Sequence, residues 1–128
     1  MARPLPRPTD AEIAILGVLW RQGPSTVRQV HEALAHTRET GYTTTLKLMQ
    51  IMADKGLVSR DERSRTHVYV ARAPREQTEQ QLVAHLLDRA FGGSAAALVQ
   101  RALSTQRASE DELREIRRLI DKYEEEQR

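Results

Sequence analysis

The sequence contains no cysteine, and only 4% of its 128 residues are aromatic. The absence of cysteine excludes disulfide bonds, thiolate metal sites and cysteine nucleophiles. Few aromatic side chains, combined with 30% charged residues, predict a small hydrophobic core. No apolar run approaches the roughly 20 residues of a membrane-spanning helix, and none follows the N-terminal arginines as in a signal peptide. We therefore expect a cytoplasmic protein, without membrane insertion, of one domain or one small domain with an extension.

Patterns typical of catalysis and metal binding are also missing. There is no glycine-rich phosphate loop, no pair of carboxylates in an apolar setting and no serine, histidine and aspartate order that suggests a triad. His31 and His36 are five residues apart, which does not place them on one helix face, so a zinc site is not expected. We predict no enzyme activity, no cofactor and no metal.

Charge is distributed unevenly, although the net charge is only +2. Residues 1–74 hold 11 Lys and Arg against 7 Asp and Glu, whereas residues 75–128 hold 9 against 11. A basic first half indicates contact with a polyanion. Many solvated surfaces show the same bias, so the charge alone does not decide between the two interpretations.

Capping signals and hydrophobic periodicity predict three helices before residue 57. Thr9-Asp10-Ala11-Glu12 is a capping box that starts the first helix, and Gly23-Pro24 ends it. The second helix starts near Ser25-Thr26 and carries one apolar stripe. The third occupies about 43–54 and ends at Gly56, a residue suited to the position after a helix.

The apolar spacing changes from helical to alternating after Gly56. Residues 57–61 and 66–71 are β-type runs on either side of the polar stretch 62–65. This pattern predicts a β-hairpin with an arginine-rich tip. Such a tip is also common in turns that are merely well solvated.

Helical spacing returns at residue 75, with apolar stripes over 82–91, 95–103 and 113–123. Three helices followed by a hairpin is the element order of a winged helix-turn-helix. We expect a mainly α fold with a small β-hairpin. Its parts would be a winged helix-turn-helix DNA-binding domain at 1–74 and a helical dimerisation domain at 75–128.

The third helix has one apolar side and one polar side. Thr45, Leu48, Met49 and Met52 cluster when residues are placed 100° apart, and the opposite side is polar. The major groove of DNA admits one helix that presents such a polar, mostly uncharged face. The same face could instead be plain solvated surface, and we favour DNA because a short helix precedes it and an arginine-tipped hairpin follows it.

Each group of polar residues has an expected role on DNA. Threonine hydroxyls bond phosphates or base edges, Lys47 can reach guanine or a phosphate, and Gln50 can pair with adenine. We expect base-edge contacts from Thr43, Thr44, Lys47 and Gln50, with Leu46 as a contact to thymine methyl groups. The residues expected to position the DNA backbone are Tyr42, Ser25, Thr26 and Arg28. Phosphate contacts are expected from Arg63, Arg65 and His67 on the hairpin and from Arg3 and Arg7 on the N-terminal arm.

Two sequence blocks are specific enough to indicate a family. The chain reads Val-Arg-Gln-Val-His-Glu-Ala-Leu at 27–34 and Tyr-Thr-Thr at 42–44, with further matching blocks at 5–12, 55–58 and 91–99. In this order and spacing they resemble the penicillinase-repressor family of bacterial transcription regulators, the BlaI/MecI/CopY group. The resemblance implies a homodimeric repressor that binds a palindromic operator in double-stranded DNA through its winged helix-turn-helix and dimerises through its C-terminal helices.

The C-terminal stripes independently suggest a second copy of the chain. They have too little partner surface in one chain of this size, and two chains could bury them against each other. The interface residues that we expect are Leu82, Leu86, Phe91, Leu98, Val99, Leu103, Leu113, Ile116, Ile120 and Tyr123. The alternative is a winged-helix protein-protein interaction module without sequence-specific DNA binding.

The chain departs from the family pattern in three respects. Leu46 and Ile51 stand where many relatives have polar residues, which suggests a different operator sequence. A C-terminal cysteine cluster, as in copper-responsive members, is absent. In β-lactam-responsive members a membrane metallopeptidase sensor triggers a cut at an Asn–Phe bond, whereas this chain reads Leu-Val-Gln-Arg-Ala at 98–102. If such a sensor is a partner here, the cut lies elsewhere, and otherwise the inducing signal is different.

Overall fold

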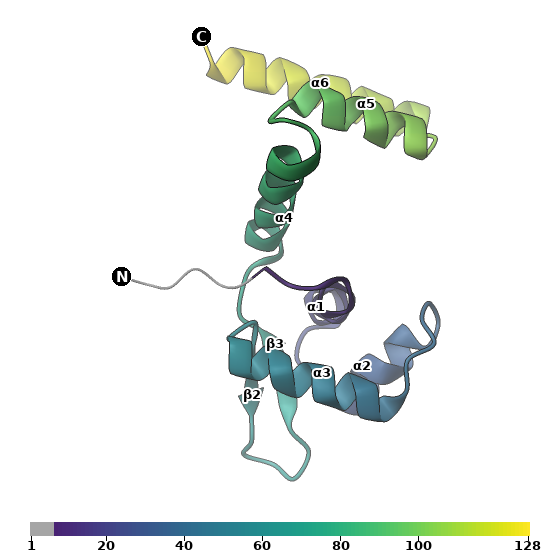
Figure 1. The fold of residues 1–128 in the computed structure, drawn as a ribbon, viewed down its shortest axis with the longest axis vertical. Helices are drawn as coiled ribbons and strands as arrows, with labels where there is room; N and C mark the ends of the chain where they lie inside the picture. The colour runs from purple at the N-terminus through teal and green to yellow at the C-terminus, as the bar shows by residue number, and fades with distance from the viewer. Residues whose placement is uncertain (1–6) are drawn as a thin grey trace. The chain divides into compact units, whose positions relative to one another are not determined.

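In the computed structural model, which describes residues 7–128, α1 (Asp10–Gln22) begins at the predicted capping box (Figure 1). The Oγ1 of Thr9 accepts the N–H of Glu12 at 3.3 Å, and the N–H of Thr9 donates to Oε1 of Glu12 at 2.8 Å. These two bonds satisfy donors that a helix start otherwise leaves unpaired. The helix ends at Gly23, whose φ of 79° lies in the left-handed region.

A two-residue strand leads directly into the second helix. β1 (Ser25–Thr26) is followed by α2 (Val27–Leu34), and Thr26 is the N-cap. Its Oγ1 accepts the N–H of Gln29 at 3.2 Å, while Oε1 of Gln29 accepts the N–H of Thr26 at 2.9 Å. This is a second capping box. Thr26 therefore both ends β1 and caps α2.

The third helix, α3 (Tyr42–Lys55), slightly exceeds the predicted range of 43–54. Its N-cap is Gly41, which offers no side chain to the free N–H groups of the first turn. Gly56 ends it in the left-handed conformation, with φ 85°, as the sequence predicts.

The predicted hairpin forms the larger part of a three-stranded sheet. β2 (Val58–Asp61) and β3 (Val68–Ala71) are antiparallel, and β1 adds to the free edge of β3, so that the order is β1-β3-β2. Tyr69 therefore pairs with Ser25 on one side and with Arg60 on the other. Three helices with this sheet make the expected winged helix, and β1 is the element that the sequence analysis missed.

The core lies where α1, α2, α3 and the sheet meet. Its most completely buried side chains come from every one of these elements; they include Leu16, Val30, Met49, Met52, Val58 and Tyr69. Beyond β3, the Nε1 of Trp20 donates to the carbonyl oxygen of Ala73 at 3.1 Å. This bond holds the end of α1 against the chain that leaves the sheet.

An ion pair between a buried carboxylate and a partly exposed ammonium joins the start of α1 to the end of α3. The carboxylate of Glu12, which is 1% exposed, receives the Nζ of Lys55 at 2.9 and 3.1 Å. Burial alone would raise the pKa of Glu12, but the N–H of Thr9 and the Lys55 ammonium together hold it below its ordinary value. Glu12 thus takes part in the cap of α1 and forms an ion pair with the last residue of α3.

The chain forms two compact units, the first ending at Ala84 and the second running from His85 to Arg128. α4 (Arg75–Ala90) contributes to both. The second unit also holds α5 (Ala95–Thr105) and α6 (Glu110–Glu126), whose N-caps Ser94 and Ser109 accept backbone N–H groups at 3.1 Å. Residues 85–128 are all described, and none of them is buried.

Of the helices within residues 7–128, none is by itself long and apolar enough to cross a membrane. Only α4 and α5 taken together, across the break between them, reach that length and composition.

Candidate nucleic-acid interface

The polar side of α3 is exposed, and its apolar side is buried. Thr45, Met49 and Met52 are each 0% exposed, and the Oγ1 of Thr45 donates to the carbonyl oxygen of Gly41 at 3.3 Å. The side chains predicted to read base edges point the other way. Thr43, Thr44, Lys47 and Gln50 are all exposed, and Leu46 is half-buried at their border. Ile51 is 37% exposed on this surface.

The start of α3 presents backbone donors. Because Gly41 supplies no side-chain cap, the N–H groups of the first turn have no acceptor from that position. The positive end of the helix dipole lies at the same place. This helix start is therefore suited to an anionic group such as a phosphate.

A cleft of about 530 Å³ lies between α3, the start of α2 and the sheet. Several residues singled out in the sequence meet there, namely Thr26, Arg28, Tyr42, Leu46, Gln50, Arg65 and His67. Val27, Arg60, Thr66 and Tyr69 complete the lining. Among the described residues, the lining includes cationic and hydroxyl side chains but no Asp or Glu.

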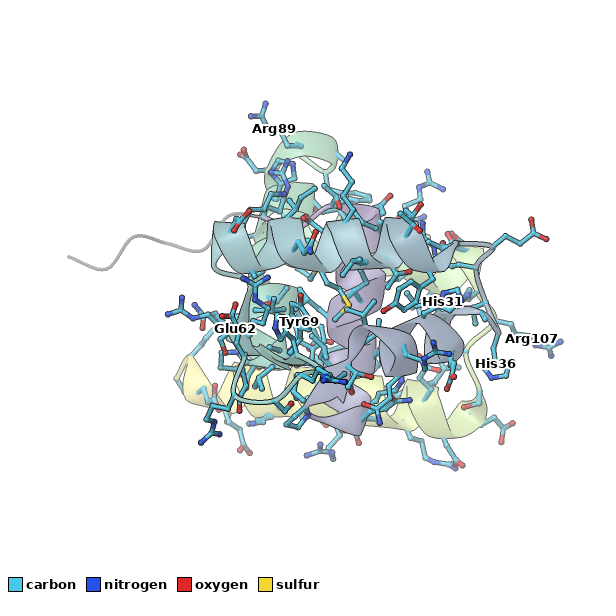
Figure 2. All side chains as sticks on the ribbon, turned by 90° about the horizontal axis from the view of Figure 1, so that it is seen from below. His31, His36, Glu62, Tyr69, Arg89 and Arg107 are labelled. Carbon is cyan, nitrogen blue, oxygen red and sulfur yellow. The ribbon has the colours of Figure 1, made fainter. Side chains whose placement is uncertain are left out.

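Tyr42 connects α2 to the cleft through ring contacts. The guanidinium carbon of Arg28 lies 6.0 Å from the Tyr42 ring centroid, within the range of a cation–π contact. The His31 ring, labelled in Figure 2, meets Tyr42 edge to face with centroids 5.9 Å apart. Arg28 and Tyr42 thus occupy one edge of the cleft together.

The tip of the hairpin is held by an ion pair. Arg63 donates from Nε to Oδ1 of Asp61 at 3.0 Å and from Nη2 to Oδ2 at 2.8 Å. The side-chain and backbone hydrogen bonds from Arg63 lower the pKa of Asp61 to about 2. Arg63 is 91% exposed in its side chain and does not line the cleft, whereas Arg65 and His67 do.

The structure contradicts one expected contact residue. Ser25 is 2% exposed, and its Oγ donates to the carbonyl oxygen of Gly23 at 2.9 Å. The hydroxyl is buried and already hydrogen-bonded within the protein, because β1 pairs with β3 at Tyr69. Ser25 therefore cannot offer its hydroxyl to DNA. Arg7 is exposed, and Arg3 lies outside the described residues.

Sequence reasoning missed Arg60. It lies on β2 directly opposite Tyr69 and lines the cleft. The alternation of the strand carries the signal, because residues 58 and 60 share a face and Val58 is in the core. Identifying that face from sequence requires knowing that Tyr69, and not Val68 or Val70, points inward.

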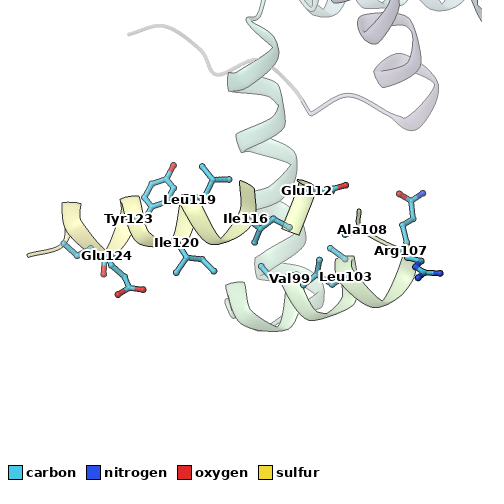
Figure 3. A pocket seen from close by; sticks show the side chains of 13 residues that line it. Val99, Leu103, Arg107, Ala108, Glu112, Ile116, Leu119, Ile120, Tyr123 and Glu124 are labelled. Atoms are coloured by element: carbon cyan, nitrogen blue, oxygen red, sulfur yellow. The ribbon is translucent and has the colours of Figure 1, made fainter. Parts of the chain in front are cut away.

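A second surface lies between α5 and α6 in the second unit (Figure 3). It is a groove of about 650 Å³. Of the expected interface residues, it brings together Val99, Leu103, Ile116, Ile120 and Tyr123. Leu119 also lines it and was missed. The other expected residues, which do not line the groove, are Leu82, Leu86, Phe91, Leu98 and Leu113.

The groove is mainly apolar and open to solvent, and the polar residues that also line it are Gln106, Arg107, Glu112, Glu124 and Gln127. Ile120 is 52% exposed and Tyr123 is 56% exposed. Exposed apolar side chains gathered in this way are typical of an interaction surface.

Comparison with known proteins gives three kinds of match. A family model described as penicillinase repressor matches residues 8–122. Transcriptional regulator BlaI of Mycobacterium tuberculosis, in strains CDC 1551 / Oshkosh and ATCC 25618 / H37Rv, is 37% identical over 119 residues, which cover 91% of this chain and 84% of the relative.

Two solution structures share the fold of the first unit. The DNA binding domain of the repressor BlaI aligns with 58% of this chain and 90% of its own, with a TM-score of 0.51. The monomeric form of Bacillus licheniformis BlaI, in complex with the blaP half-operator, aligns with 59% and 92%, also with a TM-score of 0.51. Both are 20% identical to this chain, so they support the winged-helix fold. From the family model and the M. tuberculosis relative it follows that the chain belongs to the penicillinase repressor family.

Proposed function

We propose that this chain binds a palindromic operator as a homodimer, with α3 of each protomer in a major groove. Its family makes it a DNA-binding transcriptional repressor and not an enzyme. As a DNA-binding repressor acts where its operator DNA lies, we place it at the nucleoid in the bacterial cytoplasm.

One observation supports the proposal most directly: the free polar face of α3 borders a cationic cleft. A groove-binding helix needs a face that its own protein does not use, and Lys47 and Gln50 are exposed on such a face. Arg28 and Arg65 flank it from α2 and the hairpin. Cations on both sides of a recognition helix suit the two phosphate backbones that border a groove.

The proposed contacts follow from these positions. Thr43, Thr44, Lys47 and Gln50 meet base edges, and Leu46 meets thymine methyl groups. Thr26, Arg28 and Tyr42 position the backbone at the start of α2 and α3. Phosphate contacts come from the hairpin and the arm, through Arg63, Arg65, His67, Arg3 and Arg7.

The α5–α6 groove supports dimerisation. None of residues 85–128 is buried, and the second unit exposes apolar side chains. A second copy that covers this surface would remove it from water and stabilise the unit. We assign DNA binding to residues 1–74 and dimerisation to 75–128. Two recognition helices presented by a twofold-symmetric dimer would be spaced by about one duplex turn, ~34 Å.

Derepression has two proposed routes. In one, a membrane metallopeptidase sensor is the partner, and the cut falls at a bond other than the absent Asn–Phe bond. In the other, a different signal releases the operator. Residues 100–102 are exposed but helical, so a protease would have to open α5 locally to cut there. A metallopeptidase gene beside the repressor gene would favour the first route.

The proposal is tested by fluorescence anisotropy with DNA from the protein's own promoter and with unrelated DNA of equal length. We expect tighter binding to the promoter, and a logarithm of affinity that falls linearly with the logarithm of salt concentration. The slope should approach about −0.9 per phosphate contact. If the anisotropy of neither DNA rises at any salt concentration, DNA binding would be contradicted and the protein-interaction alternative favoured.

A further inference from the structure

Arg60 occupies a position in the cleft that differs from those of the other hairpin cations. In β2 it faces the same side as Val58, which is 1% exposed and packs in the core with α3. Its cross-strand partner is Tyr69, also 1% exposed. Arg60 therefore extends from the core-facing side of the sheet into the cleft, which it lines together with Gln50 of α3.

The guanidinium of Arg60 already has an acidic neighbour. Its Nε lies 2.7 Å from Oε1 of Glu62, two residues along the chain. The side chain of Arg60 is 31% exposed, whereas that of Glu62 is 56% exposed. Glu62, labelled in Figure 2, does not line the cleft. Arg60 is itself an exposed residue, but its side chain is less exposed than that of Glu62, so the anion that neutralises it is the more solvated partner.

Tyr69 also favours the charged form of Arg60. Hydrogen bonding with the Tyr69 side chain, followed by the attraction of Glu62, raises the pKa of Arg60 above its ordinary value, against the opposing effect of burial. A guanidinium has five N–H donors. The ion pair of Nε with Glu62 and the interaction with Tyr69 leave further N–H donors for an oxyanion.

Arg63 provides the contrast. It is bound to Asp61 by two parallel hydrogen bonds and lies outside the cleft lining. Asp61 follows Arg60 in the strand and so faces the other side of the sheet. The two arginines of the hairpin that have acidic partners therefore lie in different surroundings, and Arg60 is the one in the cleft.

We propose that Arg60 is a phosphate-binding residue of the DNA interface and that Glu62 is its internal competitor, which holds the guanidinium until a DNA phosphate replaces it. The inference rests on the proposed function, since it names a further contact of the same cleft. Phosphate oxygens accept bidentate hydrogen bonds from guanidinium as carboxylate oxygens do. Glu62 is solvated enough to move into water when the exchange occurs.

This arrangement predicts opposite effects of two neighbouring substitutions. Arg60→Gln removes the phosphate contact and should weaken binding to promoter and unrelated DNA alike, by about 3- to 10-fold at low salt. The salt slope should lose about 0.9. Glu62→Gln removes both the competitor and its repulsion of phosphate, and should tighten binding by about 2- to 5-fold.

The experiment uses the full chain, with anisotropy measured across salt concentrations for wild type, Arg60→Gln, Glu62→Gln and the double variant. Glu32→Gln is the matched control, because it removes the same charge from an exposed position of α2 that does not line the cleft. We expect Glu62→Gln to tighten binding more than Glu32→Gln does. That advantage should vanish in the Arg60→Gln background.

Three results would overturn the inference. These are an unchanged affinity and slope in Arg60→Gln, a gain in Glu62→Gln no larger than in Glu32→Gln, or a gain that persists without Arg60. If Arg60→Gln fails to fold, as thermal melting would reveal, the comparison of Glu62→Gln with Glu32→Gln still decides. Wild-type protein that binds no DNA would instead overturn the proposed function.

Discussion

At the scale of single residues, the three consecutive threonines at the start of α3 differ in their exposure to solvent. Thr43 and Thr44 are exposed on the proposed DNA face, whereas Thr45 is fully buried and donates to Gly41. Successive helical residues point about 100° apart, so identical side chains have different surroundings. A threonine should therefore be judged by its position on the helix and not by its type.

The sharpest test of the recognition face is at Lys47 and Gln50. Lys47→Ala or Gln50→Ala should each cost roughly 1–3 kcal/mol in operator affinity and relax the preference for promoter DNA over unrelated DNA. Both side chains are exposed, so the fold should persist. Competition titrations with operators substituted at single base pairs measure the effect. Unchanged affinity and unchanged preference in both variants would show that another surface reads the bases.

A further prediction at this scale concerns pH and Glu12. Its pKa in the folded protein lies below the ordinary value of 4.5, so the ionised form is favoured by folding. The resulting stability is fully present above about pH 4.5 and is lost as the pH falls through the folded-state pKa. Urea unfolding over this range should show stability that declines toward acid, and Glu12→Gln should flatten that decline.

Glu125→Gln serves as the control for Glu12, because it removes the same charge from an exposed position of α6 that does not line the α5–α6 groove. A decline of equal steepness in Glu12→Gln and in wild type would assign the acid sensitivity to other groups. Lys55→Met should also destabilise the fold, by about 1–2 kcal/mol, since it leaves a buried carboxylate without its cation. The loss is limited because water already screens the Lys55 ammonium, whose side chain is 35% exposed.

At the scale of elements, Thr26 links three structures. It pairs with Val68 in the sheet, caps α2 and lines the cleft. Thr26→Ala should cost about 1 kcal/mol of stability through the lost cap. Thr26→Ser keeps the hydroxyl and should retain most of that stability. Chemical denaturation of both variants measures the difference, and equal losses would mean that the methyl group, and not the cap, matters.

Much of the fold could be predicted because strong local signals specify it. The capping box at Thr9 and the glycine after α3 both act where the sequence predicts. β1 could not be predicted, because a two-residue strand has no periodicity and exists only through its pairing with β3.

The candidate site divides in a similar way. The exposed face of α3 follows from helical spacing alone, and the structure agrees with it. Arg60 and Ser25 depend on tertiary pairing: both are cross-strand neighbours of Tyr69, and the sequence does not reveal which face of β3 turns inward. Strand alternation identifies two faces but does not by itself decide which one is buried.

At the scale of the whole molecule, the two units differ in how they bury apolar groups. The first has a closed core, whereas residues 85–128 contain no buried side chain. The second unit therefore lacks the internal packing that stabilises most folded domains. A second copy that covers the α5–α6 groove would provide it.

Val99→Asp should weaken this association, because it places a charge in the apolar groove. Gln100→Asp is the matched control, one residue away on α5 and outside the groove lining. Sedimentation across a range of concentrations should show monomers for the first variant and dimers for the second. Operator affinity should fall in parallel with dimerisation. Equal behaviour of the two variants would place the interface elsewhere.

The protein has one tryptophan, and the Trp20–Ala73 hydrogen bond makes its fluorescence a probe of the first unit. The indole is held between the end of α1 and the chain beyond β3, and it does not line the cleft beside α3. Its emission should shift toward the red when the winged helix melts and stay nearly constant when an oligonucleotide is added. Intrinsic fluorescence thus reports unfolding without responding to DNA binding. A labelled duplex in the same cuvette can report DNA binding.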